Sequence, residues 1–276
     1  MPPHRKPKLQ GRTRNDSLSA QDARIEAAAR RLRGPLERWL GKLASKITAQ
    51  AVGDLQSGKI KVQKAAPPTD QELIDLLTKF GLLQIKTAGR DVAAGLGGKW
   101  VTPPQLAATV RRQKAVLVQN IMKETRAAVR GQLRKMLLDA SKEKPIPSIG
   151  EIARRIRNTY LGPKDQRPMV VNPARAMLIA RTEAVQTENT GIQQGMAIAG
   201  VAWIEWRAHT DGKSGDRHHE RMNGKRITMA GSRGSDKTKW FQTPLGNQLR
   251  FPGDPTGPIK ETANCRCTIV PRRAGK

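Results

Sequence analysis

The sequence predicts an α+β protein, with a largely helical N-terminal part followed by a small C-terminal domain that has an antiparallel sheet and long loops. Two observations predict this class. Before about residue 200, apolar residues recur at spacings of three and four, which is typical of helices that bury one face. Beyond Gly200 the pattern changes to short apolar runs between Gly, Pro and Asp turns, which is typical of short strands. Three of the five tryptophans and two of the three phenylalanines lie in this last part.

Three helices are expected before residue 144. The first spans residues 19–56, and we expect Gly34-Pro35 to break or kink it because proline lacks an amide donor. After a linker, the second begins at Thr69 in a capping box with Glu72, and the third begins at Thr102-Pro103 with proline at the first helical position. The faces expected to be buried are Ile25, Ala28, Leu32, Leu36, Trp39 and Leu43 in the first helix, Leu73, Ile74, Leu77 and Phe80 in the second, and Leu106, Val110, Leu117, Ile121, Val129, Leu133 and Leu137 in the third.

Two further helices precede the strands. Ser148 and Glu151 form a second capping box, which predicts a short helix through Ile156. Asn172-Pro173 predicts the start of a helix over residues 173–199. Its inward positions are expected to be Ala176, Ile179, Ala180, Ile192 and Met196.

These patterns divide the chain into consecutive regions. Residues 1–16 are predicted to be a disordered basic arm, because they contain prolines and basic side chains and almost nothing to bury. A helical region follows over residues 17–144, then a second domain over residues 145–271, with its helix at 173–199 before the sheet and loops, and a basic tail at 272–276. The arm residues expected to contact DNA are Arg5, Lys6, Lys8, Arg12 and Arg14.

The charge of the chain points to a polyanionic partner. Lys and Arg total 51 against 23 Asp and Glu, a formal net charge of +28. Nucleic acid would relieve the self-repulsion, and counterion release would drive the binding. The basic residues are spread along the chain without a base-reading motif, so we expect non-specific binding to double-stranded DNA through its phosphates. No apolar run approaches the roughly 18–20 residues of a membrane span, and no membrane partner is expected.

Polar residues on the last helix and in a late turn are candidates for special roles. Arg181 and Glu183, followed by Asn189, lie on the helix over residues 173–199. We interpret them as anchors for the C-terminal sheet in preference to catalytic groups. Pro252-Gly253-Asp254-Pro255 predicts a rigid turn in which Asp254 stabilises its own loop, with a ligand role as the alternative.

The loop over residues 211–224 gathers acids and histidines. It contains Asp216, His218 and His219, and ends in the tight-turn signal Asn223-Gly224. Adjacent residues on a strand point to opposite faces, so only one of the two histidines can face a given site. Either a metal site or an ordinary loop histidine fits this pattern.

The two cysteines, Cys265 and Cys267, are expected to lie beside the loop at residues 218–223 and to join the last strand to it. Reduced structural cysteines are the preferred interpretation. The alternative is a structural zinc bound by His219, Cys265 and Cys267, with His218 or His209 as the fourth ligand. A disulfide across a single residue would be strained.

Taken together and in this order, these motifs resemble those of the phage Mu F-like head morphogenesis family. The resemblance covers about residues 145–271. The segments that carry it are Ala180-Arg-Thr-Glu183 with Asn189, a strand with Trp203 or Trp206, Asp216-Arg-His-His219, Asn223-Gly224, Pro252-Gly-Asp-Pro255, and Asn264-Cys-Arg-Cys267 before Pro271. Some relatives carry Cys-x-x-Cys where this chain has His218-His219, a departure that weakens the zinc interpretation.

The resemblance implies a minor head protein of a tailed bacteriophage, near the portal, which acts in head morphogenesis and in handling packaged DNA. Its partners would be portal and head proteins, and it would be assembled in the host cytoplasm and located in the virion head. No enzymatic activity is implied, so no catalytic residue is assigned. The alternative is a metal-dependent nuclease or toxin-like enzyme that uses the 211–223 loop, with Asp211, Asp216, His219 and Asp254 as its groups. A host nucleoid-type DNA-binding protein is a third alternative.

Overall fold

The computed structural model describes residues 14–57, 70–209, 218–229 and 240–272. The described residues form two compact units. The sheet unit takes its residues from 14–29, 81–106 and 181–272, and the helical unit from 30–80 and 107–180. The units are therefore interleaved along the chain, whereas the sequence patterns predicted consecutive domains over 17–144 and 145–271.

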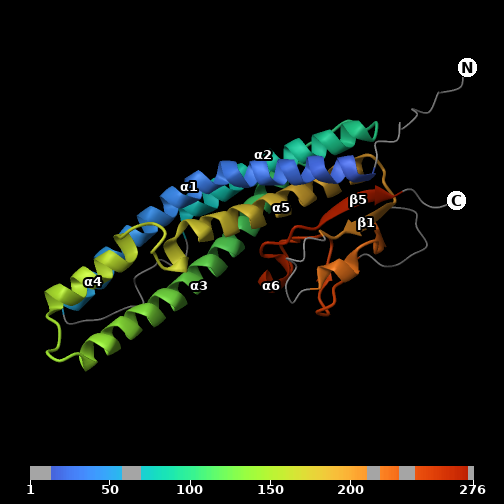
Figure 1. The fold of residues 1–276 in the computed structure, drawn as a ribbon. Helices are drawn as coiled ribbons and strands as arrows, with labels where there is room; N and C mark the ends of the chain where they lie inside the picture. Colours follow the sequence, from blue (N-terminus) through green and yellow to red (C-terminus); the bar gives the residue numbers. More distant parts are fainter. Residues whose placement is uncertain (1–13, 58–69, 210–217, 230–239, 273–276) are drawn as a thin grey trace, which may run out of the picture. The chain divides into compact units, whose positions relative to one another are not determined.

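The predicted α+β class is confirmed. The long helices are α1 (Arg14–Gln56), α2 (Gln71–Gly95), α3 (Leu106–Lys142), α4 (Ile149–Leu161) and α5 (Pro173–Ile198) (Figure 1). A short 3₁₀ turn, η2 (Met169–Val171), precedes α5. The predicted apolar faces are buried along α1 and α5, while Phe80 in α2 and Leu117 and Leu137 in α3 are only partly buried. Among the described residues, no helix combines the length and the apolar character that crossing a bilayer requires.

Helix α1 differs from its prediction at two places. It begins at Arg14, so residues 14–16 belong to the helix, and the rest of the expected arm lies outside the described residues. It also runs through Pro35 without the predicted break. Proline removes one backbone hydrogen bond to the fourth residue before it, here Arg31, which is exposed and whose carbonyl can bond to water. Leu32 and Leu36, both buried, hold the helix on either side.

Two of the predicted helix starts are confirmed and two are shifted. Ser148 accepts a hydrogen bond from the Glu151 amide at 3.2 Å, and Asn172 Oδ1 accepts one from the Arg175 amide at 3.0 Å. Helix α2 is capped by Asp70, whose Oδ1 accepts from the Leu73 amide at 3.0 Å, while Thr69 lies outside the described residues. Helix α3 starts at Leu106, three residues beyond Pro103, whose carbonyl accepts the Leu106 amide. Pro103 therefore does not occupy the first helical position.

The strands of the described residues form two small antiparallel sheets. The three-stranded sheet has the order β2 (Arg226–Thr228), β1 (Trp203–Arg207), β5 (Thr268–Arg272), with Trp203 opposite Thr228 and Trp206 opposite Ile269. The central strand is thus paired with the last strand of the chain (Figure 1). The two-stranded sheet pairs β3 (Phe241–Gln242) with β4 (Gln248–Leu249). Two one-turn elements, η4 (His219–Met222) and α6 (Ile259–Thr262), lie in the connections.

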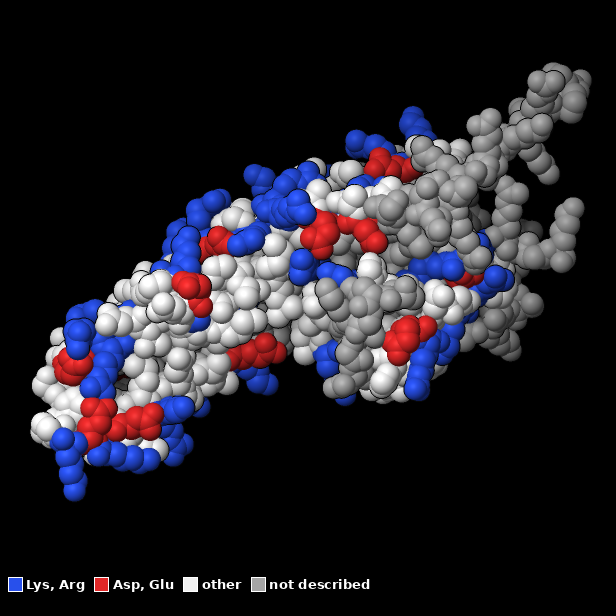
Figure 2. Space-filling model, viewed as in Figure 1, with Lys and Arg blue, Asp and Glu red and all other residues white. Residues whose placement is uncertain are grey.

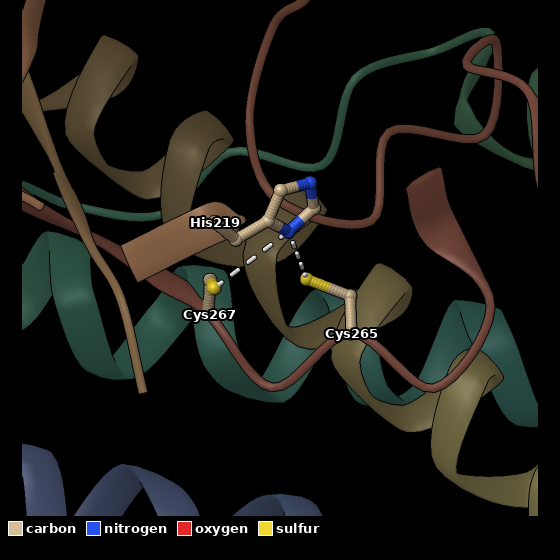
Figure 3. Close-up of side chains that lie close together, drawn as sticks. All are labelled: His219, Cys265 and Cys267. Carbon is tan, nitrogen blue, oxygen red and sulfur yellow. Dashed lines mark hydrogen bonds between the residues drawn. The ribbon is translucent and has the colours of Figure 1, made fainter. Parts of the chain in front are cut away.

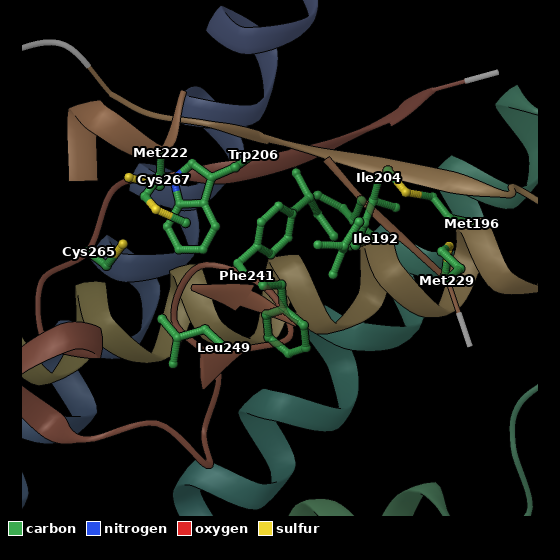
Figure 4. Packing of buried hydrophobic residues seen from close by; sticks show 14 residues of the cluster. Ile192, Met196, Ile204, Trp206, Met222, Met229, Phe241, Leu249, Cys265 and Cys267 are labelled. Carbon is green, nitrogen blue, oxygen red and sulfur yellow. The ribbon is translucent and has the colours of Figure 1, made fainter. Parts of the chain in front are cut away.

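One hydrophobic cluster forms the core of the sheet unit (Figure 4). Trp206 is fully buried in it, with its ring edge-on to Phe241 at a centroid distance of 5.1 Å and to His219 at 5.3 Å. Ala88 of α2 and Ile192 and Met196 of α5 complete it. The core therefore joins two helices to the sheet, and it includes both cysteines.

Candidate metal centre

His219 is placed by a short turn that is tied to the central strand. It opens η4, and its side chain is 1% exposed. His218 before it adopts a left-handed backbone with φ of 52°, and its carbonyl accepts the Arg221 amide. The predicted tight turn follows at Asn223-Gly224, where Gly224 has φ of 83° and donates its amide to the Trp206 carbonyl at 2.9 Å. These bonds fix the start of η4 beside β1.

The cysteines lie in the short segment between α6 and β5. Cys265 is 2% exposed and Cys267 is 4% exposed, and both are free thiols. The backbone around them is held by α5: the Asn264 amide donates to Thr182 Oγ1 at 2.9 Å, and the Cys267 carbonyl accepts from Asn189 at 3.0 Å. The segment is therefore fixed to a helix that lies about 80 residues earlier in the chain.

The structure brings His219 and both cysteines together, as predicted (Figure 3). The distance from His219 Nδ1 is 3.6 Å to Cys265 Sγ and 4.0 Å to Cys267 Sγ. The three ligand atoms lie within 4.8 Å of one another. His218 and His209 do not join this group, because His218 Nδ1 lies 3.3 Å from Glu220 and His209 Nε2 lies 3.5 Å from Asp22.

The other ring nitrogen of His219 faces a buried carboxylate. Nε2 lies 2.7 Å from Glu261 Oε2, and Glu261 is fully buried. Its second oxygen accepts from Thr243 Oγ1 at 2.5 Å and from Asn247 Nδ2 at 2.8 Å. Because a carboxylate only accepts hydrogen bonds, Nε2 carries the proton, and the lone pair of neutral His219 points from Nδ1 toward the thiols.

The electrostatics of the group favour thiolate sulfur. The hydrogen bond from Cys265, together with the contact with His219, lowers the pKa of Cys267 to about 5 against the opposing effect of burial. Burial alone would raise the pKa of Glu261, but the hydrogen bonds from Thr243, Asn247 and His219 lower it. Burial also acts to lower the pKa of His219, and the contacts with Cys267 and Glu261 outweigh it and raise that pKa. Thiolate is the form of cysteine that binds metals and attacks electrophiles.

Asn189 is the central anchor of the sheet unit. It is fully buried, and its amide group donates to the carbonyls of Pro252 at 2.9 Å and Cys267 at 3.0 Å. Its oxygen accepts from Thr268 at 3.0 Å. Of the other two predicted anchors, Arg181 lies 3.3 Å from Glu26, and Glu183 is fully buried. Asn189 thus acts as the anchor that the sequence suggested.

Asp254 stabilises its own loop, as predicted. It accepts from the Arg250 amide at 2.8 Å, from the Arg250 guanidinium at 2.7 Å and from the Thr256 amide at 3.0 Å. Although burial raises its pKa, Arg250 outweighs this effect and keeps the pKa below its usual value. Asp254 does not join the group of His219. Asp211 and Asp216 lie outside the described residues, as do Arg5, Lys6, Lys8 and Arg12.

Sequence reasoning missed Glu261, which faces His219 and is itself held by Thr243 and Asn247. Glu261 lies in no motif, and it reaches His219 across 42 residues of chain. A thiol, an imidazole and a carboxylate in a row could in principle activate a nucleophile. Both sulfurs are almost fully buried, however, which closes them to a substrate in this conformation. Coordination of a small soft cation needs no such access.

Comparison with protein-family models, curated proteins and solved structures finds no match for this chain.

Proposed function

We propose that this chain is a minor structural protein in the head of a tailed bacteriophage, near the portal, and that it acts in head morphogenesis and in handling packaged DNA. The observation that carries the proposal is that the motifs which resemble those of the phage Mu F-like family lie in contact with one another. Asn189 bonds to Pro252 and to Cys267, and His219 lies against Cys265 and Cys267. Short motifs that are distant in sequence but in contact are expected of one inherited fold rather than of chance matches.

A row of basic side chains on α3 supports the DNA-handling role. Successive positions in this row differ by 11, 3, 4 and 4 residues, which keeps them on one face of a helix. The row consists of Arg112, Lys123, Arg126, Arg130 and Arg134, of which Arg126 is partly exposed and the others exposed. It extends over about 33 Å at the usual rise of an α-helix. Such a row can follow phosphates without reading bases.

The surface charge agrees with this role. Lys and Arg side chains are distributed over the visible face, and Asp and Glu are fewer among them (Figure 2). The net charge of +28 belongs to the chain as a whole. We therefore expect duplex DNA to be bound through many weak phosphate contacts, with portal and head proteins as the protein partners.

Purified virions test the structural role. Mass spectrometry of particles from the phage or prophage that encodes the chain should detect it at low copy relative to the major capsid protein. Deleting its gene should lower the yield of infectious, DNA-filled heads, and portal and terminase genes should lie beside it. Absence of the chain from virions, together with normal titres after deletion, would refute the proposal.

Salt dependence tests the DNA role separately. The double variant Arg130→Ala/Arg134→Ala should bind duplex DNA more weakly and reduce the slope of log K against log salt by about 1.8, since each phosphate contact contributes about 0.9. The matched control is Arg33→Ala/Arg154→Ala, which removes the same charge from side chains already paired with Glu37 and Glu151. The control should keep the slope of the natural chain. An equal loss in both variants, or a strong preference for one DNA sequence, would contradict the role of α3.

A further inference from the structure

Two buried sulfurs and one imidazole nitrogen lie close together in the sheet unit. Glu261 fixes the proton of His219 on Nε2, which leaves a single lone pair on Nδ1. Both Cys265 Sγ and Cys267 Sγ approach Nδ1, and Cys265 also hydrogen-bonds to Cys267. The three atoms are therefore in mutual contact, and a shared cation would use all three as ligands.

The distances fit a tetrahedral zinc ion. With Zn–N bonds of about 2.05 Å and Zn–S bonds of about 2.3 Å, tetrahedral angles separate N from S by about 3.6 Å. The observed distances are 3.6 Å to Cys265 and 4.0 Å to Cys267. The two sulfurs lie within 4.8 Å of one another, and rotation of the cysteine side chains would have to bring them to the roughly 3.8 Å expected between two zinc-bound thiolates.

We propose that this chain binds one Zn²⁺ ion through His219 Nδ1 and the thiolates of Cys265 and Cys267. Two sulfurs and an imidazole select a soft or borderline cation and disfavour Mg²⁺ and Ca²⁺, which prefer oxygen ligands. The proposal stands independently of the phage assignment, because it uses only the ligand atoms and their surroundings.

Glu261 is the positioning residue of this zinc site. Metal-bound histidines usually donate their other N–H to a carboxylate, which fixes the ring and raises its basicity. Glu261 occupies that place at 2.7 Å and is itself held by Thr243 and Asn247. Glu261, Thr243 and Asn247 thus hold the ring of His219 so that the lone pair on Nδ1 faces the two sulfurs.

The ion would join segments that are distant in the chain. His219 lies in η4, and the cysteines lie 46 and 48 residues later, before β5. Among the described residues, no fourth His, Cys, Asp or Glu joins the group. The described residues therefore supply three ligands of the tetrahedron.

Zinc titration of the full chain is the primary test. After removal of metal by a chelator, Zn²⁺ added in competition with a chromophoric chelator should bind at one ion per chain. Cys265→Ser and Cys267→Ser should abolish this binding. The matched control is His218→Ala, because His218 is the exposed neighbour of His219 and faces Glu220. Binding that is absent from the natural chain, or lost equally in His218→Ala, overturns the proposal.

Two further measurements keep the test decisive if a buried cysteine variant fails to fold. Co²⁺ added to the natural chain should give a thiolate-to-cobalt charge-transfer band and intense visible bands typical of four-coordinate cobalt. Glu261→Gln, which preserves side-chain volume and an acceptor oxygen, should keep the circular dichroism spectrum while weakening Zn²⁺ affinity 10- to 100-fold. Cobalt bound without a charge-transfer band refutes thiolate ligation, and unchanged affinity in Glu261→Gln refutes its positioning role.

Discussion

The helical unit and the sheet unit are stabilised in different ways. In the helical unit, buried aliphatic side chains recur along α1 and α3, including Leu36, Leu43, Val118 and Leu133. The sheet unit has short strands, and its fixed points are buried polar groups such as Asn189 and Glu261. The first arrangement distributes stability over many similar contacts, whereas the second concentrates it in a few that depend on exact donors and acceptors.

This difference sets what each unit tolerates. An aliphatic core accepts substitutions of similar volume at a cost usually below about 1.5 kcal/mol. A buried amide that satisfies three partners has no substitute of similar shape that keeps both its donors and its acceptor, and losing them leaves those partners desolvated and unbonded. We therefore expect conservative changes to be mild in the helical unit and severe in the sheet unit.

Asn189→Ala should have the largest effect. It leaves the carbonyls of Pro252 and Cys267 without their donor and Thr268 without its acceptor, so we expect a loss of about 3–5 kcal/mol of unfolding free energy. Leu43→Met in α1 is the volume-conserving reference change in the other unit, and it should cost less than about 1.5 kcal/mol. Chemical denaturation of both variants measures the difference. Equal losses would break the comparison between the units.

The pH dependence of the free energy of unfolding should reveal a second polar contact on which the sheet unit depends. Glu205 on β1 accepts from Arg272 of β5 and from Arg226 of β2, so one carboxylate links all three strands. The hydrogen bonds from Arg272 are the main reason that the pKa of Glu205 falls from 4.5 to about 2. Because the folded-state pKa is the lower one, this stabilisation is complete above pH 4.5 and is lost as the pH falls toward 2.

Comparison with Glu205→Gln isolates this contribution. At pH 7 the natural chain should be more stable than the variant by on the order of 3 kcal/mol, and the gap should close between pH 4.5 and pH 2. Denaturant midpoints of the two proteins measured across that range provide the check. A gap that stays constant with pH would show that the arginines stabilise the sheet without depending on the charge of Glu205.

The comparison also explains what the sequence could predict. The sequence predicted the features that depend on local patterns. These are the apolar faces of the helices, the caps at Ser148 and Asn172, and the strand character beyond Gly200. The approach of the cysteines to His219 was also predicted, because the chain has only two cysteines and four histidines. The hydrogen bonds of Glu261 and of Asn189 join residues that are far apart in the sequence. The periodicity of apolar residues does not predict such long-range partners. The unbroken α1 at Pro35 was missed because tertiary packing outweighed a local rule.

A close helix approach in the sheet unit is another contact without a sequence signal. A Cβ atom at Gly195 of α5 would lie 2.5 Å from the carbonyl oxygen of Gly89 in α2, too close for real atoms. Gly195→Ala should therefore destabilise the chain by about 1–3 kcal/mol. Gly131→Ala on α3 is the matched control, since a Cβ there meets nothing within 4 Å. Thermal unfolding should show that the control is stabilised by about 0.5–1 kcal/mol, and the same sign in both variants would contradict the close approach.

The smallest effect is expected at the cap of α4 in the helical unit. Ser148 is exposed, and its hydrogen bond from the Glu151 amide is 3.2 Å long, so water can replace much of it in Ser148→Ala. We expect a cost of about 0.5–1 kcal/mol, and Ser148→Asp should restore it because aspartate also caps and its charge suits the helix N-terminus. Asp70 caps α2 from a buried position, so Asp70→Ala should cost more, about 1–2 kcal/mol. If Ser148→Ala instead approached the loss expected for Asn189→Ala, the helical unit too would depend on single polar contacts, and the distinction between distributed and concentrated stability would fail.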